Sequence, residues 1–232
     1  MSVLLAFDTA TEQVSIALGV HGELRLHEAA GGAQASATLI PAIMTLLGDA
    51  GLAVRDLDAI AFGRGPGAFT GLRSACAVAQ GLALGAGKPV LPIDTLLAVA
   101  EDAREGDAPQ RIWVAMDARM GEIYAAHYAF DADGWTALVA PLLSTPDALN
   151  WRWASDPPDT VAGSALAVFA QQLRPGAARL APAALPRARA LLALAQAAWE
   201  RGSALDPALA LPLYVRDKVA KTSAERDAER AR

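Results

Sequence analysis

The sequence contains an internal repeat: residues 112–119 match the pattern of residues 3–10 about 109 positions further along the chain. Each segment is an apolar run that ends in an aspartate, Asp8 in the first copy and Asp117 in the second. Each is followed by two segments with the pattern of strands, at residues 13–20 and 23–28, and at 122–130 and 135–143. A repeated unit of three antiparallel strands predicts an α/β protein built from two similar lobes.

Helical and strand patterns continue after these three strands in the first unit. The order βββαβαβ results from a helix, a strand, a helix and a strand, expected over residues 36–49, 57–62, 70–85 and 89–93. Pro41 lies inside the first of these helices. Either that helix begins near Thr38, so that the missing N–H falls in the first turn, or Pro41 kinks it.

The second unit is reduced. Its remaining elements are one strand and two helices, expected over residues 160–164, 166–173 and 187–201. Residues 101–109 are polar, charged and end in proline, which is typical of a linker, and residues 177–186 form a loose connection rich in alanine and proline. The chain therefore divides into a first lobe, a second lobe and a charged tail expected as a solvated or frayed helix: residues 1–105, 106–215 and 216–232.

Charge and cysteine content narrow the possible functions. The 232 residues carry 25 acidic and 20 basic side chains, a net charge of −5, which argues against nucleic-acid binding by this chain alone. Cys76 is the single cysteine, so no intrachain disulfide is possible, and the start of the chain lacks the pattern of a secretory signal. The apolar runs fall far short of the roughly 20 residues that span a bilayer. We expect a cytoplasmic protein whose work on RNA, if any, needs a partner.

Residues 63–71 form a glycine-rich loop between an expected strand and an expected helix, where backbone N–H groups can hold an anion such as phosphate. The strict nucleotide-binding templates fail, because no lysine follows a glycine and Thr70 stands where a third glycine belongs. The alternative is a tight turn in which Gly65 and Gly67 adopt positive φ, Phe69 fills the core and Thr70 caps the helix. Both interpretations remain open.

The two helices of the first lobe have more apolar surface than one sheet can cover. Helix 36–49 has two apolar stripes, and helix 70–85 has two stripes of small residues, at 71, 75, 79 and 83 and at 77, 81 and 85. A central helix enclosed by its own chain would explain this pattern, and so would a subunit interface. Our prediction is an interface formed by Leu39, Ile40, Ile43, Met44, Leu47, Gly71, Leu72, Ala75, Cys76 and Ala79.

Catalytic machinery is hard to find in the sequence. The three histidines, His21, His27 and His127, have no partner at helical spacing, so we expect them at the surface and predict no metal site. Cys76 has no histidine near it in sequence and is expected as an inert core thiol, and no serine-hydrolase motif occurs.

A vestigial nucleotide cleft is the best candidate for a ligand site. The two repeated aspartates would face each other across the lobes and could hold a metal–nucleotide together with the glycine loop. Alternatively, each aspartate caps its own turn. The cleft residues are Asp8, Gly65, Gly67, Thr70 and Asp117.

Four sequence blocks resemble the bacterial TsaB (YeaZ) family over nearly the whole chain. They are FDTAT at residues 7–11, IAFGRGPGAFTGLR at 60–73 with AQGL at 79–82, MDARMGEIY at 116–124, and PLYVR at 212–216. The resemblance implies two ribonuclease-H-like lobes of the actin/Hsp70/sugar-kinase superfamily, in agreement with the repeat. Ala35 stands where many relatives have histidine, a change that leaves the apolar helix face intact.

This resemblance also implies a function and partners. Such a chain is a non-catalytic subunit that pairs with TsaD through the two helices of the first lobe, and forms homodimers through them when TsaD is absent. With TsaE and a TsaC-type synthase, the complex places threonylcarbamoyl on the adenosine 3′ of the anticodon in tRNAs that read ANN codons. No intrinsic cofactor is implied, and ATP or ADP would bind at the complex interface. The H-x-x-x-H metal motif of TsaD is missing here.

Two functions of other classes compete with this one. The first is a self-sufficient ATP-dependent phosphotransferase that uses the two aspartates and the loop at residues 63–71. The second is a peptidase, for which the sequence offers no nucleophile–base pair.

Overall fold

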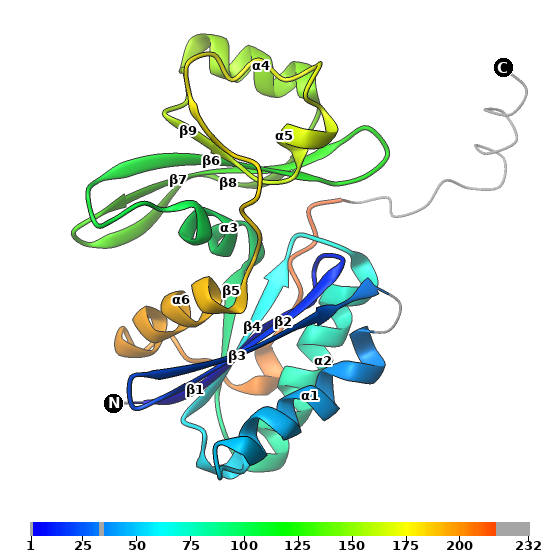
Figure 1. Ribbon diagram of the computed structural model, residues 1–232, viewed down its shortest axis with the longest axis vertical. Coiled ribbons are helices and arrows are strands. Elements are labelled where there is room, and N and C mark those ends of the chain that lie inside the picture. The colour runs from blue at the N-terminus through cyan, green and yellow to red at the C-terminus, as the bar shows by residue number, and fades with distance from the viewer. Residues whose placement is uncertain (1, 33–34, 217–232) are drawn as a thin grey trace, which may run out of the picture.

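Two five-stranded sheets of the same topology form the two lobes of the protein (Figure 1). The computed structural model describes residues 2–32 and 35–216, and the side chains of residues 35 and 36 are left out of the description. The first sheet has the order β3-β2-β1-β4-β5, with strands β1 (Val3–Asp8), β2 (Gln13–Val20), β3 (Glu23–Ala30), β4 (Ala59–Gly65) and β5 (Val90–Asp94). The second has the order β8-β7-β6-β9-β10, with strands β6 (Gln110–Asp117), β7 (Ile123–Asp131), β8 (Gly134–Ser144), β9 (Thr160–Ala162) and β10 (Arg179–Ala181).

The duplication predicted from the sequence is confirmed, but β10 was not predicted, because it lies within residues 177–186, which are expected as a loose connection. In each sheet the first three strands are antiparallel, and the last two continue from the first strand in parallel. The second lobe is reduced in the length of its strands rather than in their number, because β9 and β10 have only three residues each. Strand β1 is a continuous apolar run because it is buried on both faces of its sheet.

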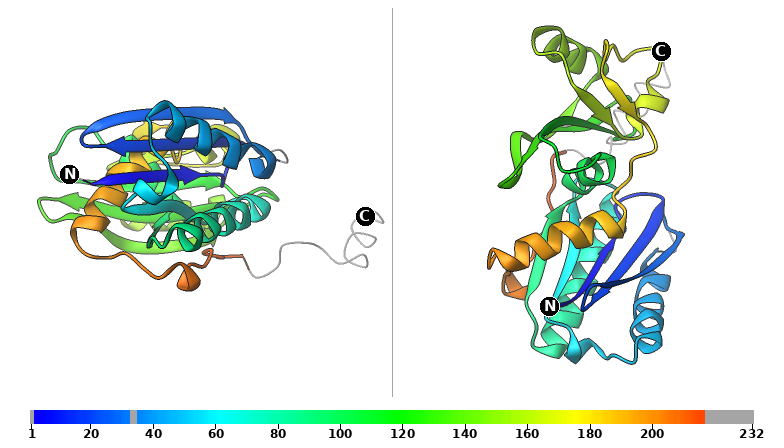
Figure 2. Two further views of the ribbon diagram at one scale, coloured as in Figure 1. Left: turned by 90° about the horizontal axis from the view of Figure 1, so that it is seen from below. Right: turned by 60° about the vertical axis from the view of Figure 1, so that its left-hand side comes forward.

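The helices alternate with the strands in the same order in both lobes. They are α1 (Ala35–Asp49), α2 (Phe69–Ala86), α3 (Thr95–Ala103), α4 (Pro146–Ser155), α5 (Ala165–Val168) and α6 (Ala188–Glu200), with 3-10 turns η2 (Val54–Asp56) and η3 (Pro207–Leu209). Helices α1 and α2 pack on one face of the first sheet and α6 on the other (Figure 2). Helices α4 and α5 lie beside the outer face of the second sheet.

The last helix of each unit crosses to the other lobe. Helix α6 packs against β1, β2, β4 and β5, whereas α3 packs against β6, β7 and α6. The sequence predicts a second lobe over residues 106–215, yet α6 and η3, which lie within that range, pack against the first lobe. Because α3 and α6 pack in this way, the two lobes share an apolar junction. Leu97 and Trp135 pack against the hydrophobic core on each side of this junction.

The structure differs from the sequence-based expectation at several element boundaries. Helix α1 begins at Ala35 rather than near Thr38, so Pro41 lies in its second turn, where it cannot donate to the carbonyl of Ala37. Helices α3 and α4 were not predicted. The linker is shorter than expected, because residues 101–103 belong to α3 and the side chain of Glu101 accepts bonds from Arg104 and Trp135. The tail at residues 217–232 lies outside the described residues, and no described helix is long and apolar enough to cross a bilayer.

Candidate functional site

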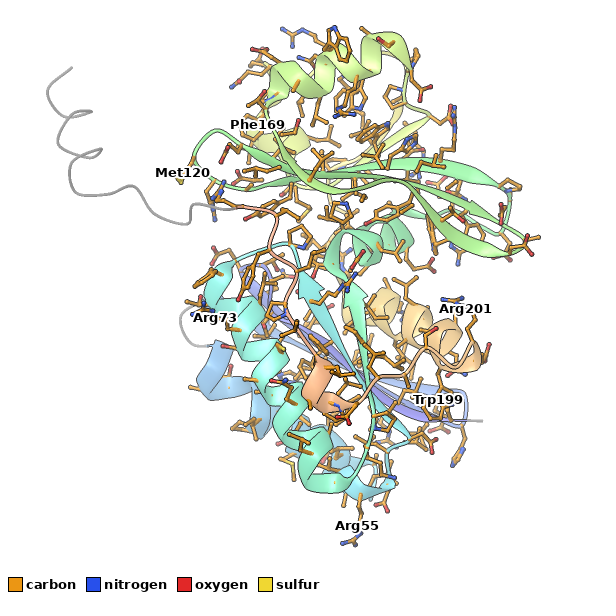
Figure 3. All side chains as sticks on the ribbon, turned by 180° about the vertical axis from the view of Figure 1, so that it is seen from behind. Arg55, Arg73, Met120, Phe169, Trp199 and Arg201 are labelled. Atoms are coloured by element: carbon orange, nitrogen blue, oxygen red, sulfur yellow. The ribbon has the colours of Figure 1, made fainter. Side chains whose placement is uncertain are left out.

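A cavity of about 600 Å³ lies between the two lobes, at the ends of β1, β4 and β6. Its first-lobe wall is formed by residues 10–13 and 66–69, and its second-lobe wall by residues 116–120 together with Tyr124, Ser164, Val168 and Leu185. Residues 213–216 close one side of it. Figure 3 shows Met120 of the second lobe and Arg73 of the first on this side of the molecule. All four sequence blocks singled out above contribute to the lining.

The glycines of the loop at residues 63–71 allow it to pack against the turn that follows β1. A Cβ on Gly63 would overlap the carboxylate of Asp8, and one on Gly71 would overlap the carbonyl oxygen of Thr9. A Cβ on Gly67 would come within 2.6 Å of the Cβ of Ala10. These glycines are therefore needed for contact between two parts of the same lobe.

Two N–H groups of this loop are bonded within the chain. The N–H of Ala68 donates to the carbonyl of Ala10 at 2.8 Å, and the N–H of Gly65 donates to Oγ1 of Thr95 at 3.0 Å. Gly65 has φ +110°, as the tight-turn interpretation predicts, but Gly67 does not adopt positive φ. Thr70 is exposed and does not cap α2, whose N-cap is Ala68 without a side-chain bond. These contacts fit a packed turn better than an open anion cradle.

Asp8 is buried beneath that loop and does not line the cavity. Only 1% of it is exposed, and its carboxylate accepts bonds from the N–H of Ala10 at 2.7 Å and from Oγ1 of Thr95 at 2.9 Å. Burial raises the pKa of Asp8 to about 6, although both hydrogen bonds favour the charged form and lower it. Its position is that of a structural carboxylate inside the first lobe.

Asp117, at the equivalent position of the second lobe, does line the cavity. Its Oδ1 accepts from the N–H of Arg119 at 2.8 Å, and its own N–H donates to Oγ of Ser164 at 3.1 Å. Arg119 also reaches across to Glu12 of the first lobe at 3.1 Å. Each aspartate therefore caps its own turn through a bond to the residue two positions on, and the two do not form a pair.

The outer faces of α1 and α2 differ from the interface predicted from sequence. Eight of those ten residues are buried inside the chain, namely Leu39, Ile43, Leu47, Gly71, Leu72, Ala75, Cys76 and Ala79. Only Ile40 and Met44 are exposed, at 43% and 48%. The reason is geometric. The stripe of α1 that contains Leu39, Ile43 and Leu47 faces its own sheet, and so does the stripe of α2 at residues 71, 75, 79 and 83. The stripe at 77, 81 and 85 is the exposed one.

Comparisons with known proteins agree with the resemblance carried by the sequence blocks. A family model described as "TsaD: tRNA N6-adenosine threonylcarbamoyltransferase" matches residues 23–224. The chain is 33% identical to TsaB of Haemophilus influenzae, with 93% of this chain and 94% of that protein aligned. It is 37% identical to TsaB of Escherichia coli over 64% of this chain, and spans 65% of that protein. The chain belongs to the TsaB (YeaZ) family.

Solved structures of this family confirm the fold. YeaZ from Pseudomonas aeruginosa superposes with a TM-score of 0.83 at 36% identity, with 92% of this chain and all of that chain covered. A second structure, described as an uncharacterized protein with similarity to peptidase YEAZ from Pseudomonas aeruginosa, gives a TM-score of 0.84 at 36% identity, with 93% and 100% covered. The TsaB-family fold therefore extends over both lobes.

The histidines and the cysteine of this TsaB-family chain do not form a reactive cluster. His127 is buried, contrary to expectation, and its ring stacks on Trp113 with centroids 4.7 Å apart. Burial lowers the pKa of His127, and the nearby Arg111 lowers it further. Cys76 is a buried thiol whose pKa is raised by burial. Within residues 2–32 and 35–216, no group of three or more histidine, cysteine, aspartate or glutamate side chains could hold a metal ion.

Sequence reasoning missed the role of residues 210–216, although it had singled out the PLYVR block that they contain. This segment forms a wall of the cavity and contacts both lobes. The available signal was the clustering of a proline, an aromatic residue and an arginine after the last helix. Such a cluster does not indicate what it contacts, because its partners lie about 90 to 150 residues away in sequence.

Proposed function

We propose that this chain is a non-catalytic subunit of the machinery that forms N6-threonylcarbamoyladenosine in tRNA, and that it pairs with a TsaD-related transferase. Its relatives are named for this biosynthesis, and the matching family model is named for the transferase. Partners of one fold can meet through equivalent helices in a pseudo-symmetric contact. The observation that carries the proposal is the apolar and nearly uncharged outer surface of α1 and α2.

This surface has features that the isolated chain does not explain. Asp49 and Arg73 are the only charged residues in the two helices, while Ile40, Met44 and Leu84 are exposed. A Cβ on Gly81 or Gly85 would meet nothing within 4 Å, so packing within the chain does not require these glycines. Each glycine costs a helix interior about 1 kcal/mol relative to alanine. A helix of a second subunit that packs closely on α1 and α2 would explain both the exposed apolar side chains and the two glycines.

The charged residues that line the cavity support a chain that does not carry out nucleotide chemistry by itself. Its two arginines already have acidic partners: Arg119 contacts Glu12 and Asp117, and Arg216 contacts Glu122. We therefore propose that the chain alone binds nucleotide weakly and that ATP or ADP binds at the junction with the transferase. TsaE, a TsaC-type synthase and tRNA would be engaged through the assembled complex in the cytoplasm, and the isolated chain would self-associate through the same helices.

The alternative of a self-sufficient phosphotransferase is not favoured. The relatives are named for tRNA modification, and the glycine loop and Asp8 are used for packing inside the first lobe. Calorimetry with ATP–Mg²⁺ on the isolated chain separates the two functions, because micromolar binding that Asp117→Asn abolishes would favour the phosphotransferase.

A mixing experiment tests the proposal. Sedimentation of this chain with the TsaD protein of the same organism should show a 1:1 complex that survives high salt, because apolar burial is not screened by ions. Met44→Glu should weaken that complex by roughly a hundredfold, since it places a charge in a dry contact. Leu138→Glu, at a similarly exposed leucine on β8, is the matched control and should leave the complex unchanged.

Two results would overturn the proposal. One is a complex that tolerates Met44→Glu and Ile40→Glu together. The other is an unchanged content of threonylcarbamoyladenosine in tRNA from cells that lack this chain, measured by mass spectrometry of nucleosides.

A further inference from the structure

Residues 211–216 run from the first lobe to the second along one edge of the cavity (Figure 1). They follow η3, which is held against α2: Nε2 of Gln80 donates to the carbonyl oxygens of Pro207 at 3.0 Å and Ala210 at 3.2 Å. The N–H of Leu213 then donates to the carbonyl of Arg64, the residue after Gly63 in the glycine loop, at 2.7 Å. The beginning of the segment is therefore fixed to the first lobe.

Tyr214 adds a side-chain contact to the same lobe. Its hydroxyl accepts from Nε of Arg73 at 3.1 Å, and its ring lies 5.3 Å from that of Phe69. The guanidinium of Arg73 sits over the ring of Phe69 at 3.8 Å, so the three side chains form one cluster of contacts. Both Arg73 and Phe69 belong to α2.

Arg216 attaches the end of the segment to the second lobe. It donates to the carbonyl oxygen of Ala118 at 2.9 Å and to the carboxylate of Glu122 at 2.6 Å, and its guanidinium lies 5.8 Å from the ring centre of Tyr124. Only 12% of the arginine side chain is exposed. A charged hydrogen bond with so little exposure is among the stronger single contacts in a protein.

The turn that receives Arg216 has an unusual backbone. Arg119 and Met120 have φ of 62° and 57°, a left-handed conformation that costs non-glycine residues roughly 1 to 2 kcal/mol each. The guanidinium of Arg216 donates to two carbonyl groups of this turn, those of Ala118 and Arg119. The MDARMGEIY and PLYVR blocks therefore contact each other in the folded chain.

We propose that residues 211–216 act as a clasp between the lobes: Arg216 fixes the angle between them and thereby the width of the cavity. The main chain also crosses between the lobes at α3 and at residues 182–187 (Figure 1), where Thr95 and Leu185 line other parts of the cavity. The clasp spans the open side, where the ion pair of Glu12 with Arg119 is largely exposed and therefore weak. Arg216 is a positioning residue in this proposal, which does not depend on the identity of any partner.

Inter-lobe distance is the direct test. Spin labels at Ala193→Cys on α6 and Ala148→Cys on α4, both exposed positions, report the distance between the lobes when labelled chains are diluted with unlabelled ones. We expect one narrow distance distribution in the parent and a broader, longer one in Arg216→Ala. Arg216→Lys should fall between them, because lysine keeps the charge but loses the planar fork that reaches several acceptors. Arg111→Ala, which removes an ion pair within the second lobe, is the control and should match the parent.

An unchanged distance distribution in Arg216→Ala would overturn the proposal, provided circular dichroism shows that the variant is folded.

Discussion

Asp8 and Asp117 hold equivalent positions in the two lobes, yet their environments are opposite. Both end the first strand of their sheet, and both accept a bond from the N–H two residues on. Asp8 is covered by the glycine loop and by Thr95, whereas Asp117 lines the cavity and contacts Arg119. The repeated strand therefore positions each carboxylate, and the loop beside it decides whether water reaches it.

The difference extends to the turns that carry these residues. The turn after β1 is held by close backbone contact with the loop and α2, which glycines permit. The turn after β6 has left-handed residues, faces the cavity and is held by Arg216. In the first lobe the turn packs against the glycine loop, and in the second lobe the equivalent turn binds Arg216 of the clasp. Three substitutions sharpen or break this comparison.

The largest effect is expected from Gly71→Ala in the first lobe. A Cβ at this position would overlap the carbonyl oxygen of Thr9, a backbone atom that cannot move without shifting the turn. We expect a loss of about 3 kcal/mol in the free energy of unfolding, measured by urea titration. The control in the second lobe is Gly121→Ala, where φ is +77° but the Cβ would meet nothing, and where about 1 kcal/mol should be lost. Equal losses would show that the two turns are held alike.

A pH-dependent effect is expected from Asp8→Asn. The pKa of Asp8 is raised from 3.8 to about 6 in the folded state, chiefly by burial. Between these values the folded chain keeps a proton that the unfolded chain has released, so the stability of the parent falls as pH rises toward 6 and then levels off. Asparagine has no such proton. Relative to the variant, the parent should lose about 2 kcal/mol between about pH 4 and about pH 8.

Urea titrations over this pH range provide the measurement for Asp8→Asn. The same series on Asp117→Asn corrects for the general effect of removing a carboxylate. A stability difference between the parent and Asp8→Asn that is constant with pH would contradict the assignment of Asp8 as a carboxylate buried by the glycine loop.

The smallest effect is expected from Arg119→Ala, which removes the ion pair with Glu12 across the cavity and the contact with Asp117 within the same turn. The side chains of Arg119 and Glu12 are largely exposed, 71% and 79%, so solvent and salt screen the attraction between them. The change in unfolding free energy should stay within a few tenths of a kcal/mol. Arg216→Ala is the contrasting variant, because that arginine is mostly buried, and it should cost clearly more. If Arg119→Ala were the more damaging substitution, the second turn would be held by the ion pair rather than by the clasp.

Much of the fold could be predicted because its signals are local. The alternation in residues 13–20 and 23–28 gave β2 and most of β3, and the repeat of residues 3–10 gave β6. Helices α3 and α4 were missed because their sequences do not show a clear signal: α3 merges into the polar residues read as a linker, and α4 is nearly as polar as a loop. The packing of α6 on the first sheet has no local signal.

The amino-acid sequence by itself determined the duplication, most of the strands and the family, because periodicity and motif spacing are properties of the chain. It also indicated that α1 and α2 have more apolar surface than one sheet covers. Only the tertiary structure decided which stripe of each helix faces inward, since residues four apart share a face whether that face meets a sheet or solvent. It likewise decided that the loop glycines permit backbone contact and that Arg216 reaches the second lobe. Both depend on segments that are distant in sequence and adjacent only after folding.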